Sequence, residues 1–187
     1  GGICIVEDFT EKKESEQLIK YHASYDTLTG LPNRRLFMDY LAGEISRAER
    51  HNYFGALLYI DIDNFKTIND SLGHSVGDEF LIMVASRLSE FIRKEDVAAR
   101  MGGDEFTILL TGLDKGQQAA HVARRMLENL AQPVLIGKQA LYITGSLGIA
   151  VFPVDGEDVD TLLKNADTAM YHAKEEGRNR VAVEPDR

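Results

Sequence analysis

Residues 100–110 read RMGGDEFTILL, so two glycines and two carboxylates stand directly before an apolar run. The apolar residues 106–110 predict one strand, and residues 97–101 predict another before it. Glycine adopts positive φ angles without a steric penalty, so Gly102, Gly103 and Asp104 predict a tight turn between the two strands. The stretch therefore indicates an antiparallel hairpin that carries Asp104 and Glu105 at or beside its turn.

The segments on either side of this hairpin alternate between helical and strand patterns. Residues 54–63, FGALLYIDID, predict a strand that ends in Asp61 and Asp63. The other expected elements are helices at residues 34–50, 65–69, 77–92, 115–131 and 159–175, a strand pair at residues 134–136 and 141–151, and a last strand at residues 180–183. Hairpins combined with covering helices predict an α+β fold, with a mixed, mainly antiparallel central sheet flanked by helices.

Length and charge narrow the class of protein. The 187 residues suffice for one compact domain, and no apolar run approaches the ~18 residues that suggest a membrane span. The net charge of −9 argues against nucleic acid or an anionic membrane as a partner, because both need clustered cations. The single cysteine, Cys4, excludes an internal disulfide and fits a small buried side chain in a reducing, cytoplasmic compartment. The parent protein could still be anchored in a membrane.

Residues 1–25 are interpreted as a connector before a domain that begins near Asp26 and extends to residue 187. Residues 3–6 predict a short strand, and a polar helix with Leu18, Tyr21 and Tyr25 at i, i+3 and i+7 follows. That spacing suits the start of a dimer seam or a helix packed on its own domain equally well. Since the chain begins with glycine and shows no signal peptide, we expect it to be part of a longer protein.

The acidic residues around the two expected strand ends are the first candidates for chemistry. If the strands are neighbours, three or four carboxylates can converge, namely Asp61, Asp63, Asp104 and Glu105. Such a cluster repels itself unless a cation neutralises it, and an all-oxygen donor set suits Mg²⁺ or Mn²⁺ better than zinc. The alternative is that each carboxylate merely solvates a surface turn. The adjacent glycines favour a ligand, because they leave space beside the backbone.

Four blocks of the sequence together resemble the GGDEF-domain diguanylate cyclases. They are GGDEF at residues 102–106, DTLTGLPNR at 26–34, DIDNFKTINDSLGHSVGDEFL at 61–81 and ADTAMYHAKEEGRN at 166–179. The resemblance spans residues 26–183 in the family's order. It implies a fold like that of the adenylyl cyclase catalytic domain and the polymerase palm. It also implies condensation of two GTP molecules into cyclic di-GMP with release of pyrophosphate, by a homodimer whose subunits face each other.

The resemblance also implies which residues act in the reaction. Asp61 and Asp104 would bind metal through their side chains and Ile62 through its carbonyl, with two Mg²⁺ or Mn²⁺ ions per active site. Glu105 would be a further catalytic acid close to them. The expected substrate-binding residues are Gly102 and Gly103 beside the nucleotide, Asn69 and Asp78 for guanine, and Lys66, Lys174 and Arg178 for phosphate.

The chemistry of these substrate-binding residues is compatible with simpler roles as well. The Asp78 carboxylate can accept from guanine N1–H and N2–H₂ while the Asn69 amide serves the remaining edge, yet both types also cap helices. Lys174 and Arg178 stand four apart near a helix end, which places two cations on one face unless Gly177 ends the helix first. Ordinary cations at a helix C-terminus follow the same pattern.

A second site is expected upstream of the glycine pair. Arg93 and Asp96 in RKED resemble the family's inhibitory product site, with Arg124 as the assisting arginine and Arg125 as a weaker candidate. Arginine binds phosphate bidentately and stacks on purines, although RKED also suits a solvated helix end. Residues 1–18 loosely resemble the end of a PAS sensor domain followed by a signalling helix.

The sequence therefore predicts an active diguanylate cyclase with product feedback inhibition. The alternative from a different class is a non-catalytic receptor for GTP or cyclic di-GMP. A polymerase-like enzyme fits poorly with the net charge of −9 and the absence of a basic patch.

Overall fold

The computed structural model describes residues 4–183 of the chain. Its helices are α1 (Cys4–His22), α2 (Arg34–His51), α3 (Phe65–Leu72), α4 (His74–Phe91), α5 (Gln117–Leu130) and α6 (Val159–Glu175). Its strands are β1 (Phe54–Ile62), β2 (Val97–Gly102), β3 (Glu105–Leu113), β4 (Val134–Ile136), β5 (Gln139–Leu141), β6 (Gly145–Phe152) and β7 (Arg180–Val183). Every helix predicted from residue 34 onward is present within a few residues of its expected bounds.

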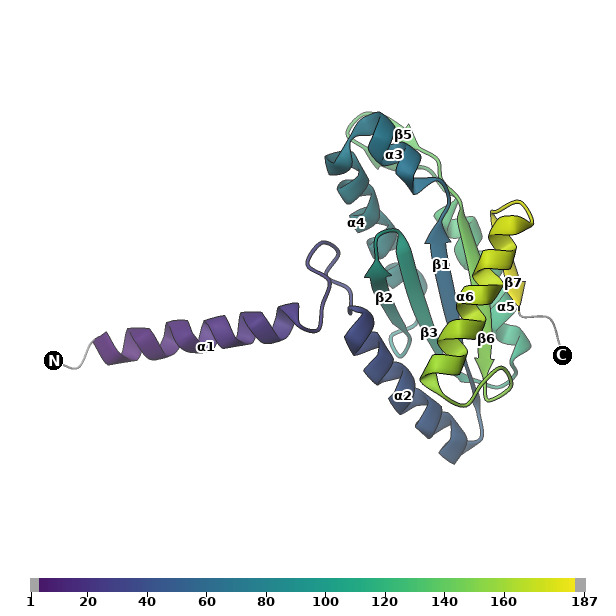
Figure 1. The fold of residues 1–187 in the computed structure, drawn as a ribbon, viewed down its shortest axis with the longest axis horizontal. Coiled ribbons are helices and arrows are strands. Elements are labelled where there is room, and N and C mark those ends of the chain that lie inside the picture. The colour runs from purple at the N-terminus through teal and green to yellow at the C-terminus, as the bar shows by residue number, and fades with distance from the viewer. Residues whose placement is uncertain (1–3, 184–187) are drawn as a thin grey trace.

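The central sheet has the strand order β2-β3-β1-β6-β7. Strand β1 pairs antiparallel with β3 and β6, β2 pairs antiparallel with β3, and β7 runs parallel to β6. Strands β4 and β5 form a separate two-stranded sheet. The predicted α+β fold with a mixed, mainly antiparallel sheet is confirmed, and β1 is its middle strand (Figure 1).

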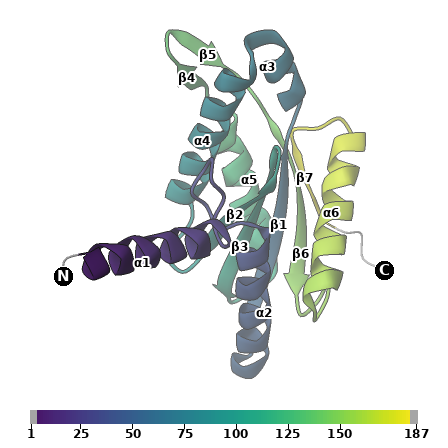
Figure 2. The same cartoon turned by 60° about the vertical axis from the view of Figure 1, so that its left-hand side comes forward.

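Helices cover both faces of the sheet, which explains the unbroken apolar run of β1. Leu58 and Ile60 belong to the apolar cluster shared with α4 and α5, whereas Leu57 and Tyr59 belong to the cluster shared with α2 and α6. Figure 2 shows α6 on one side of the sheet and α4 and α5 on the other. A strand buried on both faces is apolar at successive positions instead of alternate ones.

The N-terminal segment differs from the expectation. Residues 4–6 lie in α1 and are not a strand, while residue 3 lies outside the described residues. An apolar β-branched run forms a strand only beside a partner, and no described strand pairs with this segment. Helix α1 projects away from the domain (Figure 1) and ends before Tyr25, whose ring stacks on Tyr21 with 4.6 Å between centroids. Tyr25 therefore does not continue a helical seam with Leu18. Neither α1 nor another helix within residues 4–183 is long and apolar enough to cross a membrane.

The strand expected at residues 141–151 is in fact two strands, β5 and β6, with a break between them. At the break, the Thr144 carbonyl accepts from the Asp63 N–H at 2.8 Å, and Thr144 Oγ1 donates to Asp63 Oδ2 at 2.7 Å. These hydrogen bonds hold the chain where it passes from the small β4–β5 sheet into the central sheet. The prediction missed them because they join residues far apart in sequence.

Candidate functional site

The β2–β3 hairpin turn lies beside the C-terminal end of β1. In the antiparallel register Asp61 is directly opposite Glu105, and the Ile62 N–H donates to the Asp104 carbonyl at 3.1 Å. The three acidic residues Asp61, Asp104 and Glu105 therefore meet at one end of the central strand. Their convergence follows from the pairing of β1 with β3, as the sequence predicted for neighbouring strands.

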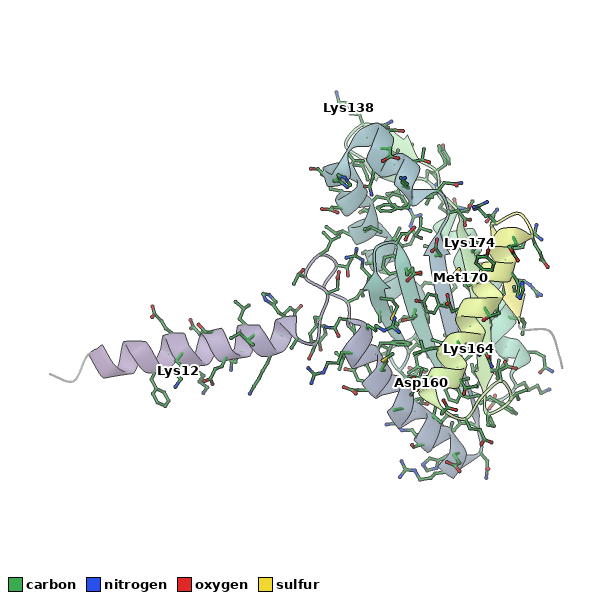
Figure 3. The ribbon with its side chains drawn as sticks, in the orientation of Figure 1. Lys12, Lys138, Asp160, Lys164, Met170 and Lys174 are labelled. Carbon is green, nitrogen blue, oxygen red and sulfur yellow. The ribbon has the colours of Figure 1, made fainter. Side chains whose placement is uncertain are left out.

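Asp61 is buried and paired with the ammonium group of Lys174. Lys174 Nζ lies 2.8 Å from Asp61 Oδ1, and Figure 3 shows Lys174 near the C-terminal end of α6, at the end of the domain toward which β1 runs. Burial raises the pKa of Asp61 to about 6; the hydrogen bond from Lys174 opposes this rise, and the charges of Asp104 and Glu105 add to it. Asp61 therefore lies in an environment that favours a neutralising cation.

This charge pattern fits a hard cation held by oxygen ligands. The lysine ammonium already contacts Asp61 as a cation, the Asp104 charge acts on Asp61, and the Asp104 backbone carbonyl accepts from the Ile62 N–H. Carboxylate and carbonyl oxygens are the ligands that Mg²⁺ and Mn²⁺ prefer. No three carboxylate, imidazole or thiol groups within the described part of the chain are close enough to hold a metal by themselves. Ions bound here would therefore need further oxygens, which the phosphates of a nucleotide can supply.

Asp63 does not join this group of carboxylates, contrary to the expectation. Its Oδ1 accepts from Ser146 Oγ at 2.7 Å, and its Oδ2 accepts from Thr144 Oγ1 at 2.7 Å and from the Asn179 N–H at 3.1 Å. With 2% of its surface exposed, Asp63 is committed to these three donors. It ties β1 to β6 and to the loop after α6, which carries Arg178.

The glycine turn is open, and an arginine that the sequence analysis missed holds it in place. Gly102 and Gly103 have φ angles of 141° and 51°, and a Cβ at either position would meet nothing within 4 Å. Arg100 Nε and Nη2 donate to the Gly103 carbonyl at 3.0 and 2.7 Å, while Arg100 Nη1 contacts both Asp26 carboxylate oxygens at 3.0 and 3.1 Å. The available signal was Arg100 two residues before the glycines and Asp26 at the start of a matching block.

Asn69 and Asp78, predicted to bind guanine, come from facing parts of α3 and α4. The Asn69 side chain lies directly over Gly77, where any larger residue would clash with Asn69 Oδ1 and the Phe65 ring. Asp78 follows Gly77 and is exposed. Helix α3 begins three residues after the end of β1, the strand end that carries Asp61. The contact of Asn69 with Gly77 thus brings Asn69 close to the residue beside Asp78, its predicted partner in guanine binding.

The three predicted phosphate-binding cations come from two places. Lys66 is exposed in the first turn of α3. Helix α6 ends at residue 175, so Arg178 lies beyond it with a φ of 62°, and its N–H donates to the Ala173 carbonyl at 3.0 Å. The expectation that Lys174 and Arg178 share one helical face is therefore wrong, because Gly177 ends the helix. Both residues nevertheless lie at the same end of α6.

Arg93 and Asp96 line a separate cavity of about 810 Å³ between α4, β3 and α5. The Asp96 carboxylate accepts from the Arg93 N–H at 3.1 Å and from the Thr111 N–H at 3.0 Å, which fixes the turn before β2. Arg93 itself is exposed. The RKED segment is therefore ordered against β3 and faces a cavity large enough for a small molecule.

The arginine that completes this cavity is not the one favoured from the sequence. Arg125 lines the cavity with Arg93, and its Cζ lies 5.7 Å from the centroid of the Phe91 ring. Arg124 lines a different cavity, between α5, β6 and β7. Neighbouring residues on a helix point about 100° apart, so only one of the two arginines can face each cavity.

The fold and the site define an α+β domain that carries its carboxylates where a hairpin turn meets the central strand. Residues 23–180 match the family model described as diguanylate cyclase, GGDEF domain. The chain belongs to this GGDEF family.

Named relatives are similar across most of this chain. MucR of Pseudomonas aeruginosa, a bifunctional diguanylate cyclase/cyclic di-GMP phosphodiesterase, is 43% identical over 84% of this chain and 23% of MucR. The crystal structure of the GGDEF domain of YfiN, or TpbB, from Pseudomonas aeruginosa has a TM-score of 0.82 at 36% identity, covering 85% of this chain and 99% of that one.

The coiled coil and GGDEF domain of DgcB from Caulobacter crescentus, in complex with c-di-GMP, has a TM-score of 0.81 at 28% identity, covering 95% of this chain and 94% of that one. The chain spans between 20% and 27% of the length of five curated relatives that it matches.

Proposed function

We propose that this domain is an active, metal-dependent diguanylate cyclase that joins two GTP molecules into cyclic di-GMP and releases pyrophosphate. The observation that carries the proposal is the meeting of Asp61, Asp104 and Glu105 at the end of β1, beside an open glycine turn. Membership of the GGDEF family and the cyclase named in MucR support this assignment.

The carboxylates are proposed to hold two Mg²⁺ or Mn²⁺ ions with GTP. Asp61 and Asp104 would contribute side-chain oxygens and Ile62 its carbonyl, with Glu105 adding negative charge beside Asp61. Bound ions of this kind polarise phosphate oxygens and lower the pKa of a hydroxyl. The chain's own contribution is to fix these ligands on a rigid strand and on a turn clamped by Arg100.

Guanine and the phosphates are proposed to bind on either side of these carboxylates. Asn69 and Asp78 on α3 and α4 supply an amide and a carboxylate for the guanine edge, which would leave adenine poorly matched. Lys66, Lys174 and Arg178 supply positive charge for the phosphates. Lys174 is suited to this role because its ammonium ends a flexible four-carbon stem at the carboxylate group.

Catalysis is proposed to require two copies of the chain, because each site holds one GTP while the product joins two. Residues 26–187 would form the cyclase domain, and residues 1–25 would link it to an upstream sensor of the PAS type. Helix α1 exposes Phe9, Leu18 and Ile19, which a second copy of the helix can cover. Association through α1 would raise the local concentration of the partner site.

The proposal is tested by measuring cyclic di-GMP formation from GTP and Mg²⁺ with the Asp104→Asn variant. Loss of a metal ligand removes several kcal/mol of transition-state stabilisation, so we expect activity to fall more than about 100-fold. Asp160→Asn is the matched control, because Asp160 is exposed at the opposite end of α6 from Lys174 (Figure 3). ATP in place of GTP should give no product. Full activity of Asp104→Asn would contradict the assignment, and wild-type binding of GTP without turnover would favour a receptor.

The cavity of Arg93, Asp96 and Arg125 is proposed to bind cyclic di-GMP as a feedback inhibitor. Three arginines line this cavity, namely Arg87, Arg93 and Arg125, and arginine binds phosphate while stacking on guanine. We expect Arg93→Ala and Arg125→Ala each to raise the cyclic di-GMP concentration for half-inhibition at least about tenfold, as for the loss of a charged hydrogen bond. Arg124→Ala should leave inhibition unchanged, because Arg124 faces another cavity. Equal inhibition of all three variants would contradict this site.

A further inference from the structure

The hydroxyl group of Tyr59 is bonded to one of the carboxylates at the site. Tyr59 Oη donates to Glu105 Oε2 at 3.2 Å, from β1 to the first residue of β3. No other hydrogen bond to the Glu105 carboxylate comes from the described residues. Thr107 lies directly opposite Tyr59 in the β1–β3 register. Tyr59 does not bond to it, because the buried Thr107 hydroxyl has no hydrogen-bond partner within the described part of the chain. Within the described residues, the Tyr59 hydroxyl therefore bonds to Glu105 and to no other side chain.

The ring that carries this hydroxyl is held rigidly. Tyr59 is 6% exposed and belongs to the apolar cluster under α2 and α6, which includes Phe37, Ala166 and Met170. Closely packed side chains keep a single rotamer, so the direction of the hydroxyl is set by the core of the domain. Glu105, by contrast, is only half-buried at the edge of the turn.

We propose that Tyr59 is a positioning residue that fixes the Glu105 carboxylate beside Asp61 and Asp104 for metal and nucleotide binding. The inference rests on the proposed cyclase function and adds a residue to which no role has been assigned. The Glu105 charge already acts on Asp61, where it contributes to the raised pKa of that carboxyl. Because the hydrogen bond from Tyr59 uses Oε2 of Glu105, Oε1 remains available to interact with a bound cation.

Removal of the hydroxyl leaves the apolar packing in place. Tyr59→Phe keeps the ring in its cluster and deletes one donor to a charged acceptor. Such a bond contributes enough to change an equilibrium about tenfold or more. Without it, Glu105 gains rotamer freedom that must be lost again when the site closes on metal and GTP, which weakens binding.

The chain offers a matched control in a second tyrosine–glutamate pair. Tyr53 Oη donates to Glu44 Oε1 at 2.8 Å, and Glu44 is buried. Tyr53 lies just before β1 begins, at the opposite end of that strand from Asp61. Tyr53→Phe therefore removes the same chemical bond without touching the site. Comparison with Tyr53→Phe therefore distinguishes a general loss of protein stability from a specific loss of Glu105 positioning.

The experiment measures Mn²⁺ affinity by electron paramagnetic resonance in the presence of α,β-methylene-GTP, together with kcat and KM for GTP. For Tyr59→Phe we expect the Mn²⁺ dissociation constant to rise about tenfold and kcat to fall by a similar factor. The KM for GTP should rise less than the Mn²⁺ dissociation constant does, because the guanine site is intact. Tyr53→Phe should match the wild type in all three values.

A double-variant cycle shows whether Tyr59 acts through Glu105. In the Glu105→Gln background the further change Tyr59→Phe should alter Mn²⁺ affinity by less than about twofold, since the charge to be positioned is gone. A tenfold loss in both backgrounds, or equal losses for Tyr59→Phe and Tyr53→Phe, would overturn the proposal. Unchanged affinity in Tyr59→Phe would also overturn it. If the wild type binds Mn²⁺ with the analogue but makes no cyclic di-GMP, the cyclase proposal fails while these affinities still decide the role of Tyr59.

Discussion

At the scale of single residues, Asp61 stands out because the fold stabilises its protonated form. Burial raises its pKa to about 6, compared with about 4 in an unfolded chain. Between these two pH values the folded chain keeps a proton that the unfolded chain has lost. The contribution of Asp61 to stability in the absence of metal therefore falls as pH rises from about 4 to about 6.

The raised pKa of Asp61 can be tested through the pH dependence of the free energy of unfolding. With chelator present, we expect the free energy of unfolding of wild type minus that of Asp61→Asn to decrease by about 2 kcal/mol from pH 4 to pH 7. Urea unfolding at a series of pH values measures the difference. Mg²⁺ added together with α,β-methylene-GTP should restore stability at pH 7 more in the wild type than in the variant, because the variant lacks the Asp61 carboxylate as a ligand. A difference that does not change with pH would contradict the raised pKa.

At the scale of elements, the hairpin turn depends on a contact between two segments 74 residues apart in sequence. Arg100 joins the Gly103 carbonyl to Asp26, which the Thr29 N–H and hydroxyl also bind at 2.8 and 2.7 Å. Burial of Asp26 raises its pKa, but the hydrogen bonds from Thr29 and Arg100 outweigh it and leave the pKa below the usual value. Asp26 is therefore charged at neutral pH and holds the turn through Arg100.

Arg100→Lys tests this clamp. Lysine keeps the charge but cannot reach the carbonyl and the carboxylate together, so we expect a loss of about 1–3 kcal/mol in the free energy of unfolding. Cyclase activity should fall at least about tenfold, because the turn that carries Asp104 is no longer fixed. Arg47→Lys is the control, because Arg47 pairs with Glu44 at 3.2 Å while its side chain is 64% exposed. This substitution should lower the free energy of unfolding by less than about 1 kcal/mol. Equal costs for both variants would contradict the clamp.

The elements also show how far sequence reasoning reaches. The hairpin, the continuous apolar strand β1 and the meeting of Asp61 with Asp104 follow from local patterns and strand pairing. The hydrogen bonds of Asp63 to Thr144 and Asn179 do not, because they join segments whose approach depends on tertiary packing. The choice between Arg124 and Arg125 likewise requires the rotation of α5 against its neighbours.

At the scale of the whole molecule, the domain is compact around its sheet while α1 extends away from it (Figure 1). Leu18 and Ile19 on α1 are 57% and 68% exposed, so this helix has apolar surface that the domain does not cover. Each copy of the domain presents one group of carboxylates. If the domain catalyses the proposed reaction, which joins two GTP molecules, its activity should depend on the association of two chains.

The most direct test of this account is the rate of cyclic di-GMP formation per chain, measured over a wide range of protein concentrations with GTP and Mg²⁺. We predict that the rate per chain rises with concentration and levels off when sedimentation shows a dimer. Leu18→Glu with Ile19→Glu should shift the rise to higher concentration, whereas Lys12→Glu on the same helix should shift it far less. The opposite result would be a rate per chain that does not change with concentration while the protein sediments as a monomer. That result would contradict a cyclase whose reaction needs one GTP site from each of two chains.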